Sequence, residues 1–556
     1  MDIKQEINIL NSAIECLDLD DDAKAVFDKL LNLIERLYQE NIQLRQENQN
    51  LKDEIQRLKG EKGKPNFKGN AKGNSGSNQD KRNSNATDAD CPIGKTPRKP
   101  WSKASKRDQI EIDKEQRIRY EGDLPTDAVS KGVRPVVVQG LKIERYNVRY
   151  LLEQFYSPSL GKTYSAALPA EVDGEFSAEL KAHVIYLYHE CRIPENKIHK
   201  LLTDRGVKIS SGQISNILSK KHEPFHDEKD EIVQAAIAAT DIQHIDDTGA
   251  RVMGVNQYFV VLCNDYFSAF FTRPKKTRLT VLSILSQNEP LGYTINGVTL
   301  DWLEAKRIPR HLLETLRSAY WLNAMTETEF IARIKAVCPR IKPRYLEWVL
   351  EAAAITWYQE KHSSERIKIL ASDAARQYVG ITERNALCWV HEERHYKKLL
   401  PVFSKHKALV KAFRKRIWDY YRKLEAYKAN PTPKAKVELE NEFDEIFSTQ
   451  TGYDALDDCI ANTYARKDGL LVVLDHPDVP LHNNPAELAV REYVIKRKIS
   501  HGTRSEDGTR SWESFLTIKD TCRKLGVNFY DYIYDRISKR FQMPSLASLI
   551  LSRASL

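Results

Sequence analysis

Three acidic residues, far apart in the chain, each stand at the edge of a predicted strand or helix. Asp246 lies in HIDDTG after a predicted strand, Asp373 follows the apolar run IKIL, and Glu487 begins the helical stretch PAELAVREYVIKRK. Carboxylate oxygens suit Mg²⁺, and a pair of such ions roughly 4 Å apart can stabilise the attacking and leaving oxygens of a phosphoryl transfer. The fold must therefore join segments that are 127 and 114 residues apart.

The order of the predicted elements around these acids indicates one topology. The segment ending in HIDDTG is followed by two strand-like runs, NQYFVVLCND and YFSAFFTRP, and the IKIL strand and the Glu487 helix come later. This is the order of an RNase H-like fold, in which the central strand, a neighbouring strand and a helix carry the three acids. Each acid taken alone could instead cap a turn or a helix, or lie on a solvated face.

A heptad repeat predicts that residues 1–60 contain an N-terminal helix and a leucine-zipper coiled coil. Leucine recurs at every seventh position, asparagine occupies two a positions, and Glu at g faces Lys or Arg at e. A buried Asn at a costs stability but fixes register and favours two strands. The predicted dimerisation residues are Leu30, Leu37, Asn41, Leu44, Asn48, Leu51 and Leu58.

Three further segments precede the acids. Residues 61–107 are rich in Gly, Asn, Ser and Lys, which predicts a disordered basic linker. Residues 108–172 alternate strand-like runs with turns and predict a small β-rich module. Residues 173–224 predict three helices with a Gly-containing turn, which fits a helix-turn-helix or an ordinary helical hairpin. In the first case the residues that meet DNA would be Gln213, Asn216, Lys220 and Lys221.

Composition narrows the class of protein. The net charge of +9 permits polyanion binding, and the eight cysteines are scattered without a CxxC pair, so neither a disulfide framework nor a zinc knuckle is expected. No apolar run reaches about 18 residues, and MDIKQEINIL lacks a signal-peptide core, so we expect a cytoplasmic protein without a membrane partner.

The motifs resemble those of the IS66 family of bacterial insertion-sequence transposases, a branch of the DDE transposases. HIDDTGARV is similar to that family's D-E-T-G motif, SDAARQY to its second-acid segment, and ALCWVHEERHYKKL to its cysteine, histidine and arginine stretch. HNNPAELAVREYVIKRK resembles its N-N-x-A-E-R-x-x-R signature, and DTCRKLGVNFYDYI its closing helix. The resemblance covers most of the chain.

The resemblance implies that Asp246, Asp373 and Glu487 are the ligands of two Mg²⁺ (or Mn²⁺) ions. Asp247 stands where the family usually has Glu, so it is a candidate outer-shell residue and a rival of Asp246. Arg491, one turn after Glu487, could orient that carboxylate or bind a phosphate. The residues implied to contact the DNA backbone are Lys496, Arg497, Lys498 and His501.

Two departures from the family pattern are visible. Residues before the helix-turn-helix lack the family's zinc-binding cysteines, so no zinc is expected and the module should be held by its apolar core. The long spacings predict helical insertions at 288–362 and 401–475. The first could clamp DNA or brace a dimer, and the basic second one could follow DNA phosphates or simply present a solvated charged face. The catalytic core then comprises residues 225–287, 363–400 and 476–556. Cys388 and His391 could suggest a metal pair, but two ligands are too few.

The whole pattern predicts a multidomain α+β protein with an N-terminal coiled coil, a small β-rich module, a helix-turn-helix and an RNase H-like α/β catalytic core with helical insertions. The predicted function is Mg²⁺-dependent DNA cleavage and strand transfer in the bacterial nucleoid. The expected partners are double-stranded DNA at element terminal inverted repeats and targets, a second copy of the chain, and optionally small accessory transposition proteins. The alternatives are a nuclease of the same fold without strand transfer, and an inactive transposase-derived DNA-binding protein.

Overall fold

The structure is a computed structural model that describes residues 20–58, 110–119, 121–123, 125, 128–129, 132–169, 172–287, 289–321, 324–361 and 365–555. Its contacts divide the chain into two units. Residues up to Arg45 together with those from Asn147 onward form one unit, and Gln46–Tyr146 form the other. The predicted linker 61–107 lies outside the described residues.

A five-stranded mixed sheet forms the centre of the first unit. Its strands are β3 (Ile242–Val252), β4 (Val255–Cys263), β5 (Ser268–Arg273), β6 (Ile369–Ser372) and β7 (Arg384–Leu387), in the order β5-β4-β3-β6-β7. β3, β4 and β5 pair antiparallel, whereas β3, β6 and β7 pair parallel. Met253 and Gly254 join β3 to β4 with φ of 48° and 80°, as a two-residue hairpin turn requires. The two strands predicted after HIDDTG and the strand before Asp373 are present, but Asp246 does not follow a strand end as predicted: β3 continues through it to Val252, where it pairs with β4.

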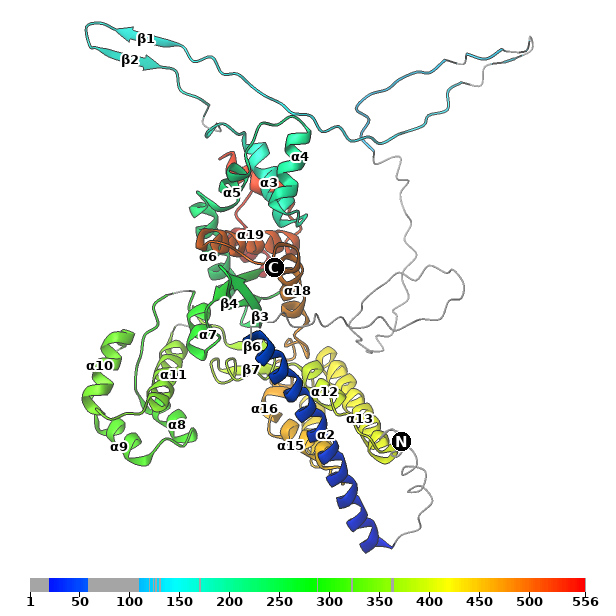
Figure 1. The fold of residues 1–556 in the computed structure, drawn as a ribbon, viewed down its shortest axis with the longest axis vertical. Coiled ribbons are helices and arrows are strands. Elements are labelled where there is room, and N and C mark those ends of the chain that lie inside the picture. The colour runs from blue at the N-terminus through cyan, green and yellow to red at the C-terminus, as the bar shows by residue number, and fades with distance from the viewer. Residues whose placement is uncertain are drawn as a thin grey trace. The chain divides into compact units, whose positions relative to one another are not determined.

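Helices from the end of the chain cover the antiparallel part of this sheet. α18 (Asn484–Ser500) packs on β3 and β4, and α19 (Glu506–Lys524) packs on β5 and on α6 (Glu223–Ala239) (Figure 1). α20 (Phe529–Ile537) and α21 (Leu546–Ala554) follow, and α21 packs along α6. Phe259 of β4 stacks on Tyr493 of α18, which shows how closely this helix contacts the sheet.

Three short helices precede the sheet in the sequence. They are α3 (Ala178–His189), α4 (Glu195–Asp204) and α5 (Ser211–Ser219), and the side chains of Ser177 and Ser210 cap the first and the third. The three helices predicted here are confirmed. α3 and α5 pack against α19, and His222, just after α5, meets Ser511 of α19.

Two helical insertions interrupt the sheet, as the spacings predicted. α7 (Arg278–Leu285), α8 (Gly297–Ala305), α9 (Arg310–Ser318), α10 (Glu327–Val337) and α11 (Pro343–Glu360) lie between β5 and β6. α12 (Trp389–Lys397), α13 (Ser404–Ala429), α14 (Pro433–Phe447), α15 (Asp454–Tyr464), α16 (Lys467–Leu470) and α17 (Val472–Asp475) lie between β7 and α18. The second insertion has its own apolar core, to which Phe413 and Tyr420 of the basic helix α13 contribute.

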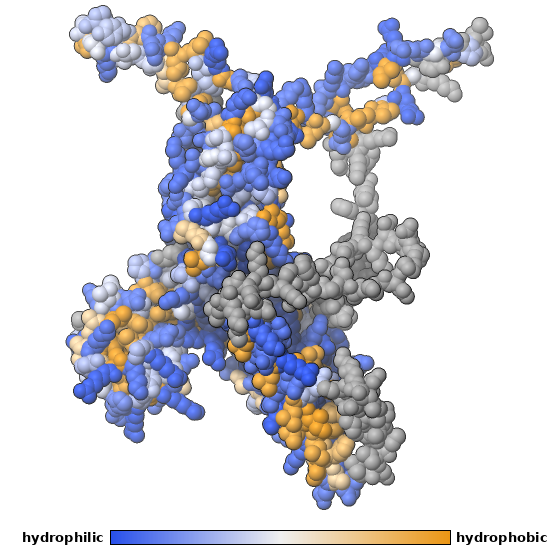
Figure 2. Space-filling view, viewed as in Figure 1, coloured by the Kyte–Doolittle hydropathy of each residue, from blue (hydrophilic) through white to orange (hydrophobic). Residues whose placement is uncertain are grey.

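The predicted zipper segment is a single helix, α2 (Asp21–Leu58), with two different faces. One face is buried on the second insertion: Glu35 meets His406 of α13, and Asn32 donates to the carbonyl of Gly452 at 2.9 Å. The zipper leucines Leu30 and Leu37 lie on another face and are 49% and 54% exposed. Figure 2 shows hydrophobic residues on the surface along α2.

The predicted β-rich module contains less strand than the sequence suggested. Among the described residues from 110 to 169, regular structure is limited to the hairpin of β1 (Gln154–Ser157) and β2 (Lys162–Ser165). Its apolar side chains, such as Phe155 and Leu160, are exposed, so an apolar core holding this segment together was a wrong expectation for these residues. Alternating β-branched residues satisfy the pattern of a strand without supplying a partner strand.

Across the described ranges, none of the helices combines the length and the apolar composition needed to cross a membrane.

Candidate functional site

The pairing of β3 with β6 places Asp246 beside Asp373. The parallel register joins Ile242 to Ile369 and His244 to Ala371, an offset of 127 residues. Asp246 and Asp373 are separated by the same 127 residues, and each lies two positions beyond the last pair, His244 and Ala371. The charge of Asp373 also raises the pKa of Asp246, so the two acids lie near each other. Neighbouring strands lie about 4.8 Å apart, so the two carboxylates project from adjacent backbones.

Asn483 holds the start of α18 against the same end of β3. Its side-chain N–H donates to the carbonyl of Ile245 at 2.8 Å, and its amide oxygen lies 2.9 Å from Nδ1 of His244. An amide oxygen only accepts, so the Nδ1–H of His244 is the donor. Asp246 shares the strand face of His244 because side chains alternate along a strand. Glu487, in the first turn of α18, is thereby brought to the face that carries Asp246.

The electrostatics of the two adjacent aspartates distinguish them. Burial, together with the charges of Asp373, Asp247 and Glu487, raises the pKa of Asp246 to about 7, although the hydrogen bond from the backbone N–H of Asp247 opposes the rise. Asp247 instead accepts hydrogen bonds from Tyr378 at 2.6 Å and Gln377 at 2.9 Å, and Lys276 lies 3.3 Å away. Within the described ranges, Asp246 thus forms no ion pair with Lys or Arg and faces other acids.

Oxygen donors surrounded by like charge form a site that a hard divalent cation would stabilise. Such a cation would offset the repulsion that raises the pKa of Asp246. Asp246, Asp373 and Glu487 are all carboxylates, the ligand type that Mg²⁺ and Mn²⁺ prefer. The residues present therefore fit a Mg²⁺ site, with Asp247 engaged by its own donors.

The Glu487 carboxylate contacts α12 rather than the predicted Arg491. Its Oε1 lies 3.5 Å from Nδ1 of His391, and its Oε2 accepts from Arg394 at 3.3 Å. Arg491 is exposed, and within the described part of the chain it forms no ion pair with Glu487. The prediction that Arg491 orients Glu487 is therefore wrong for this structure, because Arg491 points to solvent. Phosphate binding by Arg491 stays a prediction.

The basic run after Glu487 divides between a groove and the interior. Arg497, Lys498 and His501 line a groove of about 580 Å³, together with Arg251 and Tyr258 of the β3–β4 hairpin. Lys496 is a correction: it is 1% exposed, and its Nζ donates to the carbonyl of Tyr188 at 2.7 Å. Lys496 follows Ala489 and Tyr493 on the inner side of α18, so its ammonium cannot reach a phosphate.

A glycine fixes the end of the basic run on the sheet. Gly502 has a φ of 107°, and a Cβ there would lie 2.2 Å from the carbonyl oxygen of Arg251. The N–H of Thr503 donates to that same carbonyl, and the N–H of Met253 donates to Thr503. The groove is therefore bounded by backbone segments that are hydrogen-bonded to each other.

The four residues predicted to read DNA from the third short helix lie together. Gln213, Asn216, Lys220 and Lys221 line a pocket of about 940 Å³. Lys220 also forms an ion pair with Asp507 of α19, and the pocket includes acids such as Glu228 and Glu231. The pocket is thus mixed in charge.

Sequence reasoning missed several residues that organise this site. Asn483 and Arg394 stood inside the quoted motifs without a role, and Tyr378 follows Asp373 by five residues. Only the asparagine pair before the helix was a usable signal, since a buried Asn next to an N-terminal turn often makes hydrogen bonds across elements. The partners His244 and Asp247 lie more than one hundred residues away, and local pattern does not encode that distance.

Comparison with known proteins assigns the class. A model described as "Transposase IS66 family" matches residues 173–298 and 361–511, which include all three acids and the basic run. The uncharacterized protein y4jO of Sinorhizobium fredii (strain NBRC 101917 / NGR234) is 34% identical over 325 residues, which is 58% of this chain and 100% of that protein. These matches place the chain among transposases, a class of nucleic-acid-modifying enzymes. The chain belongs to the IS66 transposase family.

Proposed function

We propose that the chain is a DNA transposase of the DDE type with an RNase H-like core. The observation that carries the proposal is the shared offset of 127 residues, which brings Asp246 near Asp373 while Asn483 holds Glu487 near them. A central strand, its parallel neighbour and a helix then deliver one carboxylate each. The sheet order β5-β4-β3-β6-β7 agrees with that core.

Each acid has a defined part in the proposed reaction. Asp246, Asp373 and Glu487 would bind two Mg²⁺ ions, and Asp247 would be held outside them by Tyr378 and Gln377. Two such ions supply activation of an attacking oxygen and stabilisation of the leaving oxygen. Water first attacks the phosphodiester at an element end and releases a 3′-hydroxyl. That hydroxyl then attacks a target phosphodiester, so one P–O bond forms as another breaks.

Two surfaces would bind DNA. The groove of Arg497, Lys498 and His501 lies on the hairpin that continues from Asp246, so phosphates bound there would extend from the reacting bond. The helices α3, α4 and α5 would act as a helix-turn-helix, with Gln213 and Asn216 reading terminal repeats. The acids of the adjoining pocket would repel DNA phosphates, so the duplex would have to approach along the exposed side of α5.

Dimerisation through α2 would hold two element ends together. Leu30, Leu37 and Leu51 are exposed. Leu31 and Glu35 are buried and belong to the face of α2 that contacts the second insertion. A second copy of α2 could cover the leucine seam without displacing the contact with His406. The side chain of Leu58 lies outside the described residues.

The test is a joining assay with DNA that carries the flanks of the gene, in Mg²⁺, with proteins encoded beside it supplied in parallel. Strand-transfer products from the wild type, lost in Asp246→Ala, Asp373→Ala and Glu487→Ala, are the expected result. Cleavage without joining would favour the nuclease instead. Specific DNA binding without any reaction would favour the inactive DNA-binding protein.

A further inference from the structure

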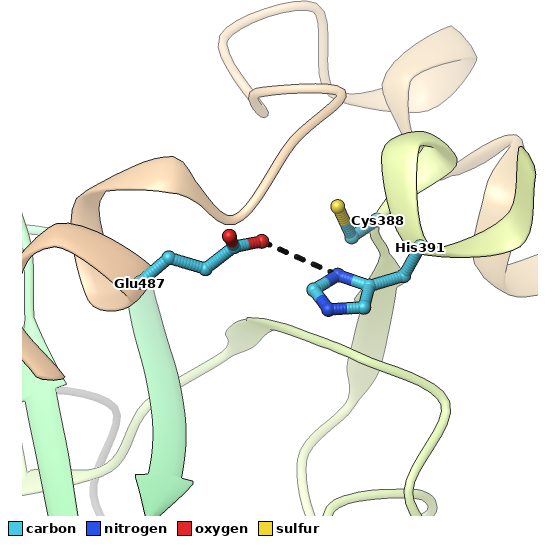
Figure 3. A group of neighbouring side chains, drawn as sticks. All are labelled: Cys388, His391 and Glu487. Carbon is cyan, nitrogen blue, oxygen red and sulfur yellow. Dashed lines mark ion pairs between the residues drawn. The ribbon is translucent and has the colours of Figure 1, made fainter. Parts of the chain in front are cut away.

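Glu487 is part of a second cluster of metal-ligating side chains. Cys388 and His391 stand at the start of α12, and the sulfur, an imidazole nitrogen and a carboxylate oxygen of the three residues lie within 4.8 Å of one another. Figure 3 shows the three side chains converging from α12 and α18. Cys388 and His391 alone supply two ligands, and the fold adds a third from a residue almost one hundred positions later.

The distance between His391 and Glu487 suits a shared ion better than a hydrogen bond. Nδ1 of His391 and Oε1 of Glu487 are 3.5 Å apart, and both atoms are buried without a hydrogen-bond partner among the described residues. For nitrogen and oxygen ligands about 2.1 Å from a tetrahedral Zn²⁺, the separation between the two ligands is about 3.4 Å. An ion between them would satisfy two buried polar atoms that otherwise cost stability.

The surroundings of Cys388 favour a thiolate once a cation is present. Cys388 is the N-cap residue of α12, and its sulfur accepts the backbone N–H of Asn483 at 3.3 Å. Burial raises the pKa of the thiol, while N–H groups of His391, Asn483 and Val390 lower it. Backbone donors at a helix N-terminus stabilise negative charge on sulfur.

We propose that Cys388 Sγ, His391 Nδ1 and Glu487 Oε1 form a site for one borderline-soft divalent cation of the Zn²⁺ class. Mg²⁺ selects oxygen ligands and would leave this site to a softer ion. Three protein ligands leave a fourth position open to water. The thiol proton leaves to solvent on binding. The sequence offered Cys388 and His391 as two ligands, too few for a metal site, and the fold supplies Glu487 as the third.

Arg394 controls access to the site. Arginine only donates, so its 2.9 Å contact with Nε2 of His391 requires that nitrogen to be unprotonated and Nδ1 to carry the proton. A cation on Nδ1 requires the proton on Nε2, so the guanidinium must turn away. The Arg394 side chain is 41% exposed and has room to do so. Removing its charge should therefore tighten metal binding.

One consequence rests on the proposed function. This ion would compete with the Mg²⁺ ions of the DDE site for the Glu487 carboxylate, so occupancy should inhibit Mg²⁺-dependent DNA cleavage. Metal binding itself does not depend on that function and is measured separately.

The test is titration of the full-length chain with Co²⁺. The thiolate-to-Co²⁺ charge-transfer absorption monitors binding, and Zn²⁺ serves as the competitor. One Co²⁺ per chain is expected, displaced by Zn²⁺. Cys388→Ser and His391→Ala should weaken binding by at least about 100-fold, since loss of outer-shell partners alone costs 10- to 100-fold. Arg394→Gln should tighten it on the order of tenfold.

Matched controls separate this site from adventitious binding. Cys191→Ser removes an exposed thiol and should leave the absorption unchanged. Asp373→Ala should also leave the absorption unchanged, while it abolishes any DDE activity. Far-UV circular dichroism checks that Cys388→Ser folds, and His391→Ala tests a ligand whose ring is partly exposed. No thiolate absorption in the wild type, or absorption that persists in Cys388→Ser and His391→Ala, would overturn the proposal.

Discussion

Replacing Asn483 by alanine should loosen β3 and the start of α18 together. The change removes both side-chain hydrogen bonds of a residue that is 1% exposed, and it leaves the carbonyl of Ile245 and Nδ1 of His244 buried without these partners. Each unsatisfied buried group costs about 1–3 kcal/mol. Water can enter the space that alanine leaves and recover part of this. We therefore expect a loss of about 2–4 kcal/mol in the free energy of local opening.

Hydrogen exchange measured by mass spectrometry is the suitable assay, because a chain with several domains does not unfold in one step. Peptides covering Ile242–Val252 and the first turn of α18 should exchange roughly 30- to 700-fold faster in Asn483→Ala, the factor that corresponds to this free energy. The matched control is Asn484→Ala, an exposed asparagine one residue later. Equal exchange in the two variants would refute the role given to Asn483.

Three further outcomes are expected. In the absence of divalent ions, the melting temperature should fall as the pH rises from about 4 to about 7. Because the pKa of Asp246 is raised in the folded state, the folded state binds the proton of this carboxyl more tightly than the unfolded state does. Asp246→Asn should remove much of this pH dependence in melting curves. Glu35→Gln breaks a buried pair and should expose α2 to limited proteolysis, at a cost of about 3–5 kcal/mol, whereas Glu40→Gln on the exposed side should not. Arg497→Ala should weaken DNA binding and reduce the slope of log affinity against log salt by about 1, while Lys496→Ala should lower the melting temperature and leave that slope unchanged.

The sequence predicted what local patterns encode. The strands after HIDDTG and before Asp373, the long helix from Asp21 and the three short helices between 178 and 219 each follow from residues within one element. The spacing between acids also located both helical insertions, because a compact core does not need so many residues.

Such local patterns do not predict contacts between elements that are distant in the sequence. The contact of Glu35 with His406 and the convergence of Cys388 and His391 on Glu487 depend on tertiary packing. The prediction of a β-rich module was wrong for the described residues because alternation of apolar residues alone does not provide a partner strand.

Lys496 shows a signal that was present and overlooked. A run of lysine and arginine suggests a uniformly basic surface, yet α18 buries Ala489, Tyr493 and Lys496 at helical spacing. Helical periodicity therefore assigns Lys496 to the inner face, where Tyr188 and Trp512 surround its ammonium.

The central claim is that the acids joined by the β3–β6 register bind the ions of one DNA-cleaving site. Asp373→Cys tests it most directly, by comparing DNA cleavage in Mg²⁺ and in Mn²⁺, with Asp265→Cys in an exposed turn as the control. Thiolate binds Mg²⁺ poorly and accepts softer ions. Asp373→Cys should be inactive in Mg²⁺ and regain cleavage in Mn²⁺, while Asp265→Cys should be active in both. Full activity of Asp373→Cys in Mg²⁺ would contradict it.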